Sequence, residues 1–291
     1  MLNLRNMRFL KLIGLSLCLI GFSFQAEAQN VMSARPGSPE PMNITVHYLV
    51  RPPFVIENSN PNAGPSGVEG EIFQKFIEWM RVKKRVQVQA TYKSYTQFDA
   101  FYETVKGGKP NDIGFGNVTI TDARSKEVQF SPAYLKSISV LVTPGNVPTI
   151  TSNEELKERL SKLTGLTSTR SVHAVYMDEL RAKHLPNLSM EFVNDQNGIP
   201  RKIAMAQKHF GYVDIITYWY FMKESNHFLK IHRFLSRGNE RMGFIMPTES
   251  NLMPYVMEFF ESGFGFTATK NYRDILEKYL GYEIISTVEV N

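Results

Sequence analysis

Residues 112–134 read DIGFGNVTITDARSKEVQFSPAY, and this stretch decides the expected fold and site. A short apolar strand over 113–115 ends at glycine, and the hydroxyl residues Thr119 and Thr121 then lead into a turn that contains Arg124. In open α/β sheets, ligands bind beyond the carboxyl ends of the strands. Backbone N–H groups, threonine hydroxyls and a guanidinium in that place suit a carboxylate, because a guanidinium binds one through two parallel bonds. The alternative interpretation is that Thr121 caps a helix and Arg124 is solvated.

On both sides of this stretch, apolar residues alternate between strand-like and helix-like spacing. Strands are expected over 44–50, 86–92, 113–115, 137–143, 213–217 and 242–246. Helices are expected over 68–80, 98–105 (capped by Thr96), 156–163 (capped by Asn153), 174–184, 199–210, 252–260 and 272–280. The alternation predicts a doubly wound parallel sheet with helices on both faces. It is interrupted and then restarts, as two α/β lobes require.

The N-terminus has the pattern of a secretory signal peptide. A basic segment (5–11) precedes an apolar run (12–24) and the small-x-small site Ala26-Glu27-Ala28. The apolar run is too short for an ordinary membrane span. We therefore expect cleavage after Ala28, followed by a flexible polar tail over 29–41. Two alternatives are a retained anchor helix and a lipoprotein attached at Cys18, although Leu17 stands where a small residue is expected.

Composition narrows the class of protein. Hydrophobic residues make up 43% and charged residues 21%, which is typical of soluble globular proteins and speaks against disorder. Cys18 is the only cysteine and lies in the segment to be removed, so neither disulfides nor cysteine-bound metals are expected. The formal net charge is +5, and three of the bases belong to the N-terminal segment, so nucleic acid is not an expected partner. No later segment stays apolar for about 18 residues, so the exported chain is expected to be soluble.

Local catalytic motifs are absent from the sequence. It contains no G-x-G-x-x-G, P-loop, G-x-S-x-G or H-E-x-x-H pattern, and its six histidines show no ligand spacing on one helix face. We therefore expect a binding protein without a catalytic site, a metal or a cofactor. Catalytic residues distant in the sequence remain an open alternative, since acids and bases can meet only in the fold.

Residues 112–134 resemble the central motif of the periplasmic solute-binding proteins of the polar amino-acid type, the family 3 extracellular solute-binding proteins. The matching positions are Asp112, Thr119, Thr121, Arg124, Val128, Phe130, Ser131 and Tyr134. In one departure, Ala133 separates Pro132 from Tyr134, which are adjacent in the family. Further marks follow in order: Pro-Pro-Phe at 52–54, GVEGEI at 67–72 and YRDILEKYLG at 272–281.

The resemblance implies a type II periplasmic-binding fold: two doubly wound α/β lobes joined by two β-like crossovers, with a ligand cleft between the lobes. Lobe 1 would comprise 42–142 and 239–291, and lobe 2 would comprise 143–238. The lobes would close by a hinge on a small carboxylate or amino-acid-like solute. The protein would then be a periplasmic monomer that delivers the solute to an inner-membrane ABC permease. A dehydratase-like periplasmic lyase and a solute-sensing module for a signalling partner are the alternatives on the same fold.

In the first lobe, the resemblance assigns the ligand carboxylate to Arg124, helped by Thr119. Asn117 matches another polar contact position. Arg51 stands where the family often has an aromatic residue that stacks on the ligand, and Tyr48 lies near the same strand end.

In the second lobe, the family offers a helix N-terminus whose free N–H groups meet the carboxylate. Here that segment contains Arg170 in place of glycine, followed by Ser171. The family acid that pairs with the ligand ammonium is replaced by the run 218–220 (YWY). An unpaired ammonium in a closed cleft is costly, so we expect an anion such as an organic acid rather than a standard α-amino acid. Trp219 forms either a stacking wall or part of the core.

Overall fold

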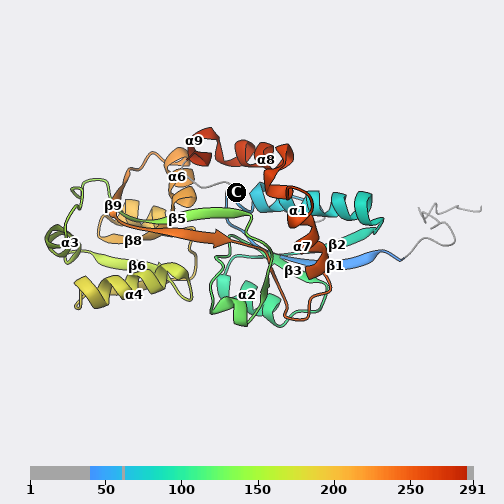
Figure 1. Cartoon of the computed structure of the whole chain (residues 1–291). Coiled ribbons are helices and arrows are strands. Elements are labelled where there is room, and N and C mark those ends of the chain that lie inside the picture. Colours follow the sequence, from blue (N-terminus) through green and yellow to red (C-terminus); the bar gives the residue numbers. More distant parts are fainter. Residues whose placement is uncertain (1–39, 61–62, 287–291) are drawn as a thin grey trace, which may run out of the picture. The chain divides into compact units, whose positions relative to one another are not determined.

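The computed structural model describes residues 40–60 and 63–286 (Figure 1). The predicted signal segment with its cleavage site, the alternative lipid attachment at Cys18 and nearly all of the predicted tail lie outside the described residues. Within the described ranges, no helix is both long enough and apolar enough to cross a bilayer.

The first sheet has five strands in the order β2-β1-β3-β10-β4. Its strands are β1 (Met42–Leu49), β2 (Val88–Tyr95), β3 (Asp112–Phe115), β4 (Gln129–Phe130) and β10 (Ile245–Met246). β1 pairs in parallel with β2 and β3, whereas β10 runs antiparallel to β3 and β4. Associated helices are α1 (Gly67–Trp79), which continues as the π-helical turn Met80–Lys84, α2 (Phe98–Lys106), α7 (Met253–Glu261), α8 (Lys270–Leu280) and α9 (Tyr282–Ile285). We call this sheet and its helices the first lobe.

The second sheet also has five strands, in the order β7-β6-β8-β5-β9. Its strands are β5 (Leu135–Pro144), β6 (Thr164–Ser168), β7 (Met190–Val193), β8 (His209–Asp214) and β9 (Leu229–Met242). β6 is parallel to β7 and β8, and β5 is antiparallel to β8 and β9. Its helices are α3 (Asn153–Leu160), α4 (Val172–His184), α5 (Ile199–Ala206) and α6 (Ile215–Glu224). We call this sheet and its helices the second lobe.

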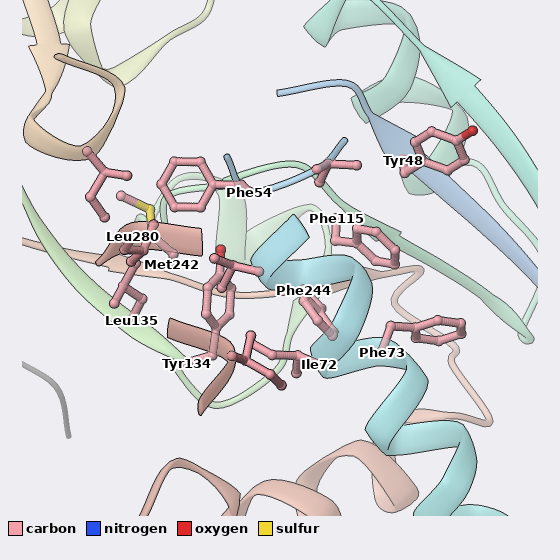
Figure 2. Packing of buried hydrophobic residues seen from close by; sticks show 14 of the residues in the cluster. Tyr48, Phe54, Ile72, Phe73, Phe115, Tyr134, Leu135, Met242, Phe244 and Leu280 are labelled. Carbon is pink, nitrogen blue, oxygen red and sulfur yellow. The ribbon is translucent and has the colours of Figure 1, made fainter. Parts of the chain in front are cut away.

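Burial follows each strand's place in the first sheet. All four residues of β3 are buried because β1 and β10 flank it, whereas the edge strand β2 alternates between partly buried and exposed side chains. Behind the sheet, the ring of Phe115 lies 5.2 Å from that of Phe244, which lies 5.6 Å from that of Tyr134 (Figure 2). Burying each such ring stabilises the fold by about 1.5–3 kcal/mol, so this core fixes the strand ends that carry the candidate site.

The two-lobed α/β class is confirmed, and β1, β2 and β3, from which the parallel sheet was predicted, are parallel. The sheets also contain β5, β9 and β10, which run antiparallel to their neighbours. The predicted strand over 213–217 begins four residues too late and ends three residues too late. β8 ends at Asp214, whose carboxylate accepts a bond from the Thr217 backbone N–H and thereby starts α6. The predicted helix over 199–210 ends at Ala206, because Gln207 adopts a left-handed conformation with φ 55°.

Two predicted helix caps are also wrong by one residue. The Ser152 hydroxyl, and not Asn153, accepts a bond from the Glu155 backbone N–H at the start of α3. Gln97 occupies the cap position of α2 in place of Thr96. The sequence analysis did not predict β6, β7 or most of β9. In these strands, buried and exposed side chains do not alternate regularly.

Two long strands, β5 and β9, lie where the chain passes from one sheet to the other. β5 follows β4 of the first sheet, and β9 precedes β10 of the same sheet, while β5 and β9 pair along most of their length. The predicted lobe boundaries at 142/143 and 238/239 fall inside these strands. The division of the chain at those residues stays a prediction.

Candidate ligand-binding site

A narrow cavity lies between residues of the two lobes, and its wall is mainly polar and charged. The first lobe contributes Arg51, Phe98, Asn117, Thr119 and Arg124, and the second contributes Ser171, Val172, His173, Gln196, Asp214, Glu240 and Met242. The structure thus brings together five of the eight predicted site residues: Arg51, Asn117, Thr119, Arg124 and Ser171. The other three, Tyr48, Arg170 and Trp219, do not line this cavity.

Arg124 is held in the cavity wall by both lobes. Its backbone N–H donates to the Thr121 hydroxyl at 3.2 Å, in the short 3₁₀ turn Arg124–Lys126. Its Nη1 donates to the Thr119 carbonyl at 2.9 Å, and its Nη2 donates to the Arg170 carbonyl at 3.0 Å. The guanidinium carbon also lies 4.9 Å from the ring centroid of Phe98. Two of its five N–H donors are therefore engaged, and the others are available to a ligand.

Arg51 follows β1 and is only 6% exposed. Its Nη2 donates to Gln196 Oε1 at 2.8 Å, across the two lobes. Its buried Nε has no hydrogen-bond partner among the described residues. Burial lowers the pKa of Arg51, and the carboxylates of Asp214 and Glu69 oppose that shift. A buried donor without a partner is costly, so an acceptor placed at this atom would be stabilising.

Asn117 joins the two lobes at the end of β3. It adopts a left-handed conformation with φ 57°, which asparagine tolerates better than most residues. Its backbone N–H donates to Glu69 Oε2 at 2.8 Å, and its Nδ2 lies 3.5 Å from Asp214 Oδ2. Burial raises the pKa of Glu69 to about 7. Thr119 is also buried, and it pairs with Met242 as an isolated β-bridge.

Ser171 begins α4 in the second-lobe wall. Its hydroxyl accepts a bond from the Ala174 backbone N–H at 3.0 Å and donates to the Ser168 carbonyl at 2.8 Å. The hydroxyl is therefore used as a helix cap, and what Ser171 offers a ligand is the N-terminal end of α4, where anions are favoured.

Four second-lobe residues that the sequence analysis did not select form a continuous chain of hydrogen bonds. Gln196 Nε2 lies 2.8 Å from His173 Nδ1, and His173 Nε2 lies 2.8 Å from Ser139 Oγ. Ser139 Oγ donates to Glu240 Oε1 at 2.5 Å. No local signal could have found them, because they come from four different elements or loops. Three of them, His173, Gln196 and Glu240, line the cavity.

Burial sets the charge states of His173 and Glu240, the two titratable residues of this chain of hydrogen bonds. Burial lowers the pKa of His173 to about 3, and the positive charges of Arg51 and Arg124 lower it further. The imidazole is therefore neutral at neutral pH. Burial raises the pKa of Glu240 to about 7, and nearby Asp214 adds to this, while Ser139, Tyr176 and Arg124 oppose it.

Three predicted site residues serve other contacts. Arg170 turns outward with φ 56°, and its Nη2 donates to Glu103 Oε1 of α2 at 2.6 Å. Tyr48 is buried in the first-lobe core (Figure 2). Trp219 packs against the core beside Gly281, and the ammonium of Lys223 lies 5.2 Å from its ring centroid.

The sequence has no acid at 218–220, but two other acids, Asp214 and Glu240, line the cavity. In the described part of the chain, no group of three or more His, Cys, Asp or Glu side chains is placed to hold a metal ion.

Comparison with known proteins agrees with this arrangement. Residues 44–282 match the bacterial extracellular solute-binding proteins, family 3. The chain belongs to this family. A comparison with curated protein sequences found no match.

Several solved structures share the fold. An ancestral arginine-binding protein bound to glutamine is 20% identical, with a TM-score of 0.64, and the match covers 84% of this chain and 100% of that one. The GluR0 ligand-binding core from Nostoc punctiforme, in complex with L-glutamate, is 16% identical, with a TM-score of 0.62 and coverage of 82% and 99%. The ancestral amino acid-binding protein AncCDT-1, a precursor of cyclohexadienyl dehydratase, is 16% identical, with a TM-score of 0.60 and coverage of 82% and 95%. At these identities the likeness establishes the fold alone.

Proposed function

We propose that this family 3 protein is an exported, monomeric receptor that closes on a small polar solute, an amino acid or a related carboxylate, in the periplasm. It would then deliver the solute to an inner-membrane ABC permease. Family membership supports the binding role, and the basic, apolar and small-residue pattern of residues 5–28 supports export. The proposed division of the chain is 42–142 with 239–291 and 143–238, which differs from the division by sheets in placing most of β5 and the end of β9 with the first lobe.

The observation that carries this proposal is that Arg51 and Arg124 line one cavity between the lobes. A carboxylate between the two guanidiniums would neutralise their mutual repulsion and give Arg51 Nε an acceptor. Thr119, Asn117 and the start of α4 at Ser171 would supply the remaining polar contacts. Closure around such a ligand is favoured because both lobes contribute to its binding.

We also propose that the site binds its ligand without turnover. Arg51 and Arg124 remain charged at all ordinary pH values, and the pKa of His173 is too low for a base at neutral pH. Glu240, with a pKa of about 7, is the wall residue suited to exchange a proton with a ligand, so turnover has to be measured directly. One relative is a precursor of a dehydratase, so turnover of a prephenate-like acid is the matching control for the enzymatic alternative.

The experiment is a thermal-shift panel of amino acids and organic acids at matched concentrations, followed by calorimetry of the hits. The stability that a binding protein gains from its ligand grows with the logarithm of ligand concentration over Kd. We expect carboxylate-bearing ligands to stabilise the wild type and the exposed control Arg181→Ala equally, and not Arg124→Ala. Stabilisation of Arg124→Ala equal to that of the wild type would refute the site. Consumption of a prephenate-like acid would refute the absence of turnover.

A further inference from the structure

Glu240 occupies an unusual electrostatic position in the cavity wall. It lies near the end of β9, is 4% exposed, and accepts a bond from Ser139 Oγ through Oε1. It has no ion-pair partner within the ranges 40–60 and 63–286. A buried carboxylate without an ion-pair partner is costly, so Glu240 is stabilised either by keeping a proton or by binding a positive group.

The neighbouring acid is already engaged. Asp214 caps α6 by accepting bonds from the Thr217 backbone N–H at 2.8 Å and from its hydroxyl at 2.5 Å. It also lies 3.5 Å from Asn117 Nδ2. Glu240 is therefore the acid in this wall with the larger unmet demand for a positive partner.

Hydrogen-bond direction shows that the chain of Gln196, His173 and Ser139 brings Glu240 a neutral donor and no positive charge. Arg51 donates to Gln196 Oε1, so Gln196 presents its Nε2 donor to His173 Nδ1. His173 Nδ1 must then accept, which leaves the proton of the neutral ring on Nε2, facing Ser139. Ser139 in turn donates to Glu240. Each link has a single donor and a single acceptor, so the chain fixes the positions of both Arg51 and Glu240 while leaving His173 uncharged.

We propose that Glu240 binds the ammonium group of the ligand, so that the site selects solutes carrying an ammonium as well as a carboxylate. This inference rests on the proposed function and names its substrate class. It reverses our expectation of an organic acid, which considered only the acid missing at 218–220. The role of that acid passes from α6 to a residue on β9, and the Gln196–His173–Ser139 chain connects this residue to Arg51.

Ammonium binding at Glu240 should change the number of protons that the protein binds. The groups facing its carboxylate are Ser139, Tyr176, Asp214 and Arg124. With a pKa of about 7, Glu240 is partly protonated in the free protein at neutral pH. An ammonium stabilises the ionised form, so binding releases part of a proton to the buffer. Ligands without the ammonium would not cause this release.

The test uses matched ligand pairs that differ only in the α-ammonium: L-glutamine with glutaramate, L-glutamate with glutarate, and L-arginine with 5-guanidinovalerate. Each is titrated calorimetrically into wild type, Glu240→Gln and the control Glu191→Gln, in two buffers of different ionisation enthalpy at pH 7. Glu191 is partly exposed on β7, where it pairs with Lys202 and His209, away from the cavity.

For at least one pair, we expect the wild type and Glu191→Gln to prefer the amino acid by at least about 30-fold, with proton release. The Glu240→Gln variant should lose that preference and the proton release. Its affinity for the desamino partner should change by less than about threefold, which also shows that the variant is folded. If the wild type binds both members of each bound pair equally, or Glu240→Gln keeps the preference, the role of Glu240 is refuted and the receptor function stands. If the wild type binds no member of this series or of the wider panel, the proposed function itself fails.

Discussion

The guanidinium of Arg170 lies 2.6 Å from the carboxylate of Glu103 and links the turn before α4 in the second lobe to α2 in the first. The two side chains are 45% and 48% exposed, so solvent screening leaves the pair with little intrinsic strength. Because it joins the lobes, however, it stabilises only the conformation in which they meet. Arg124 contacts the same turn through the Arg170 carbonyl, so the outer ion pair and the cavity wall share one backbone segment.

We expect Glu103→Gln and Arg170→Ala each to weaken ligand binding by less than about tenfold, and the double variant by no more than the larger single effect. The reason is that both changes remove the same interlobe contact. The loss should shrink in about 1 M salt, where charges are screened within about 3 Å. Calorimetric titration of all four proteins measures the coupling. A loss of about 100-fold in Arg170→Ala alone would instead indicate direct ligand contact by Arg170.

Arg124→Ala should weaken binding by at least about 30-fold, since it leaves a desolvated ligand carboxylate without its charged partner. Arg124→Lys should recover only part of this, because an ammonium keeps the charge but cannot donate two parallel bonds. Lys126→Ala, an exposed change in the same 3₁₀ turn, is the control and should bind as the wild type does. Equal affinities for all three variants would place the ligand elsewhere.

How far the sequence could predict this site depends on how local each contact is. Asn117, Thr119 and Arg124 lie within eight consecutive residues after one strand, so their shared position could be inferred from the motif alone. Glu240 and Gln196 reach the cavity only because β9 and the loop before α5 meet in space. No pattern of residue spacing in the sequence predicts that these two segments come together.

The same distinction explains the misplaced side chains. The helix N-terminus at Ser171 could be predicted from its neighbours, but the direction of the adjacent Arg170 side chain depends on Glu103, which lies on another lobe. Trp219 could be either wall or core from sequence, and the fold packs it against the core, near Gly281 of the C-terminal region.

Gly67 should be intolerant of substitution because it sets the start of α1. Its φ is 95°, and an added Cβ would lie 2.4 Å from the Phe54 carbonyl oxygen. That carbonyl accepts a bond from the Glu69 backbone N–H, so any shift would also disturb the buried carboxylate behind the cavity. We expect Gly67→Ala to lower the free energy of unfolding by more than about 2 kcal/mol.

Gly263 is the matched control for Gly67. Its φ is 66°, yet a Cβ there would meet nothing within 4 Å. Gly263→Ala should therefore cost only the backbone preference, about 1 kcal/mol. Urea unfolding of the two variants compares them directly. Equal losses in the free energy of unfolding would show that the Phe54 carbonyl can move away from the added Cβ at no energetic cost.

Glu69 should make the protein less stable as pH rises from 5 to 8. Its pKa in the folded protein is about 7, above the 4.5 of the exposed side chain. Between these values the folded state binds more protons than the unfolded state, so stability falls with increasing pH. The loss for such a shift is up to about 3 kcal/mol. Glu240, with a similar pKa, contributes in the same direction.

Urea unfolding at pH 5, 6, 7 and 8 measures this decline. We expect Glu69→Gln to show a shallower decline than the wild type, because the amide does not ionise. Buried His173 and His232, with pKa values of about 3 and 4, act in the opposite direction below about pH 6.5, but equally in both proteins. Exposed Glu158→Gln should keep the wild-type slope. A Glu69→Gln slope as steep as that of the wild type would mean that other groups take up the proton.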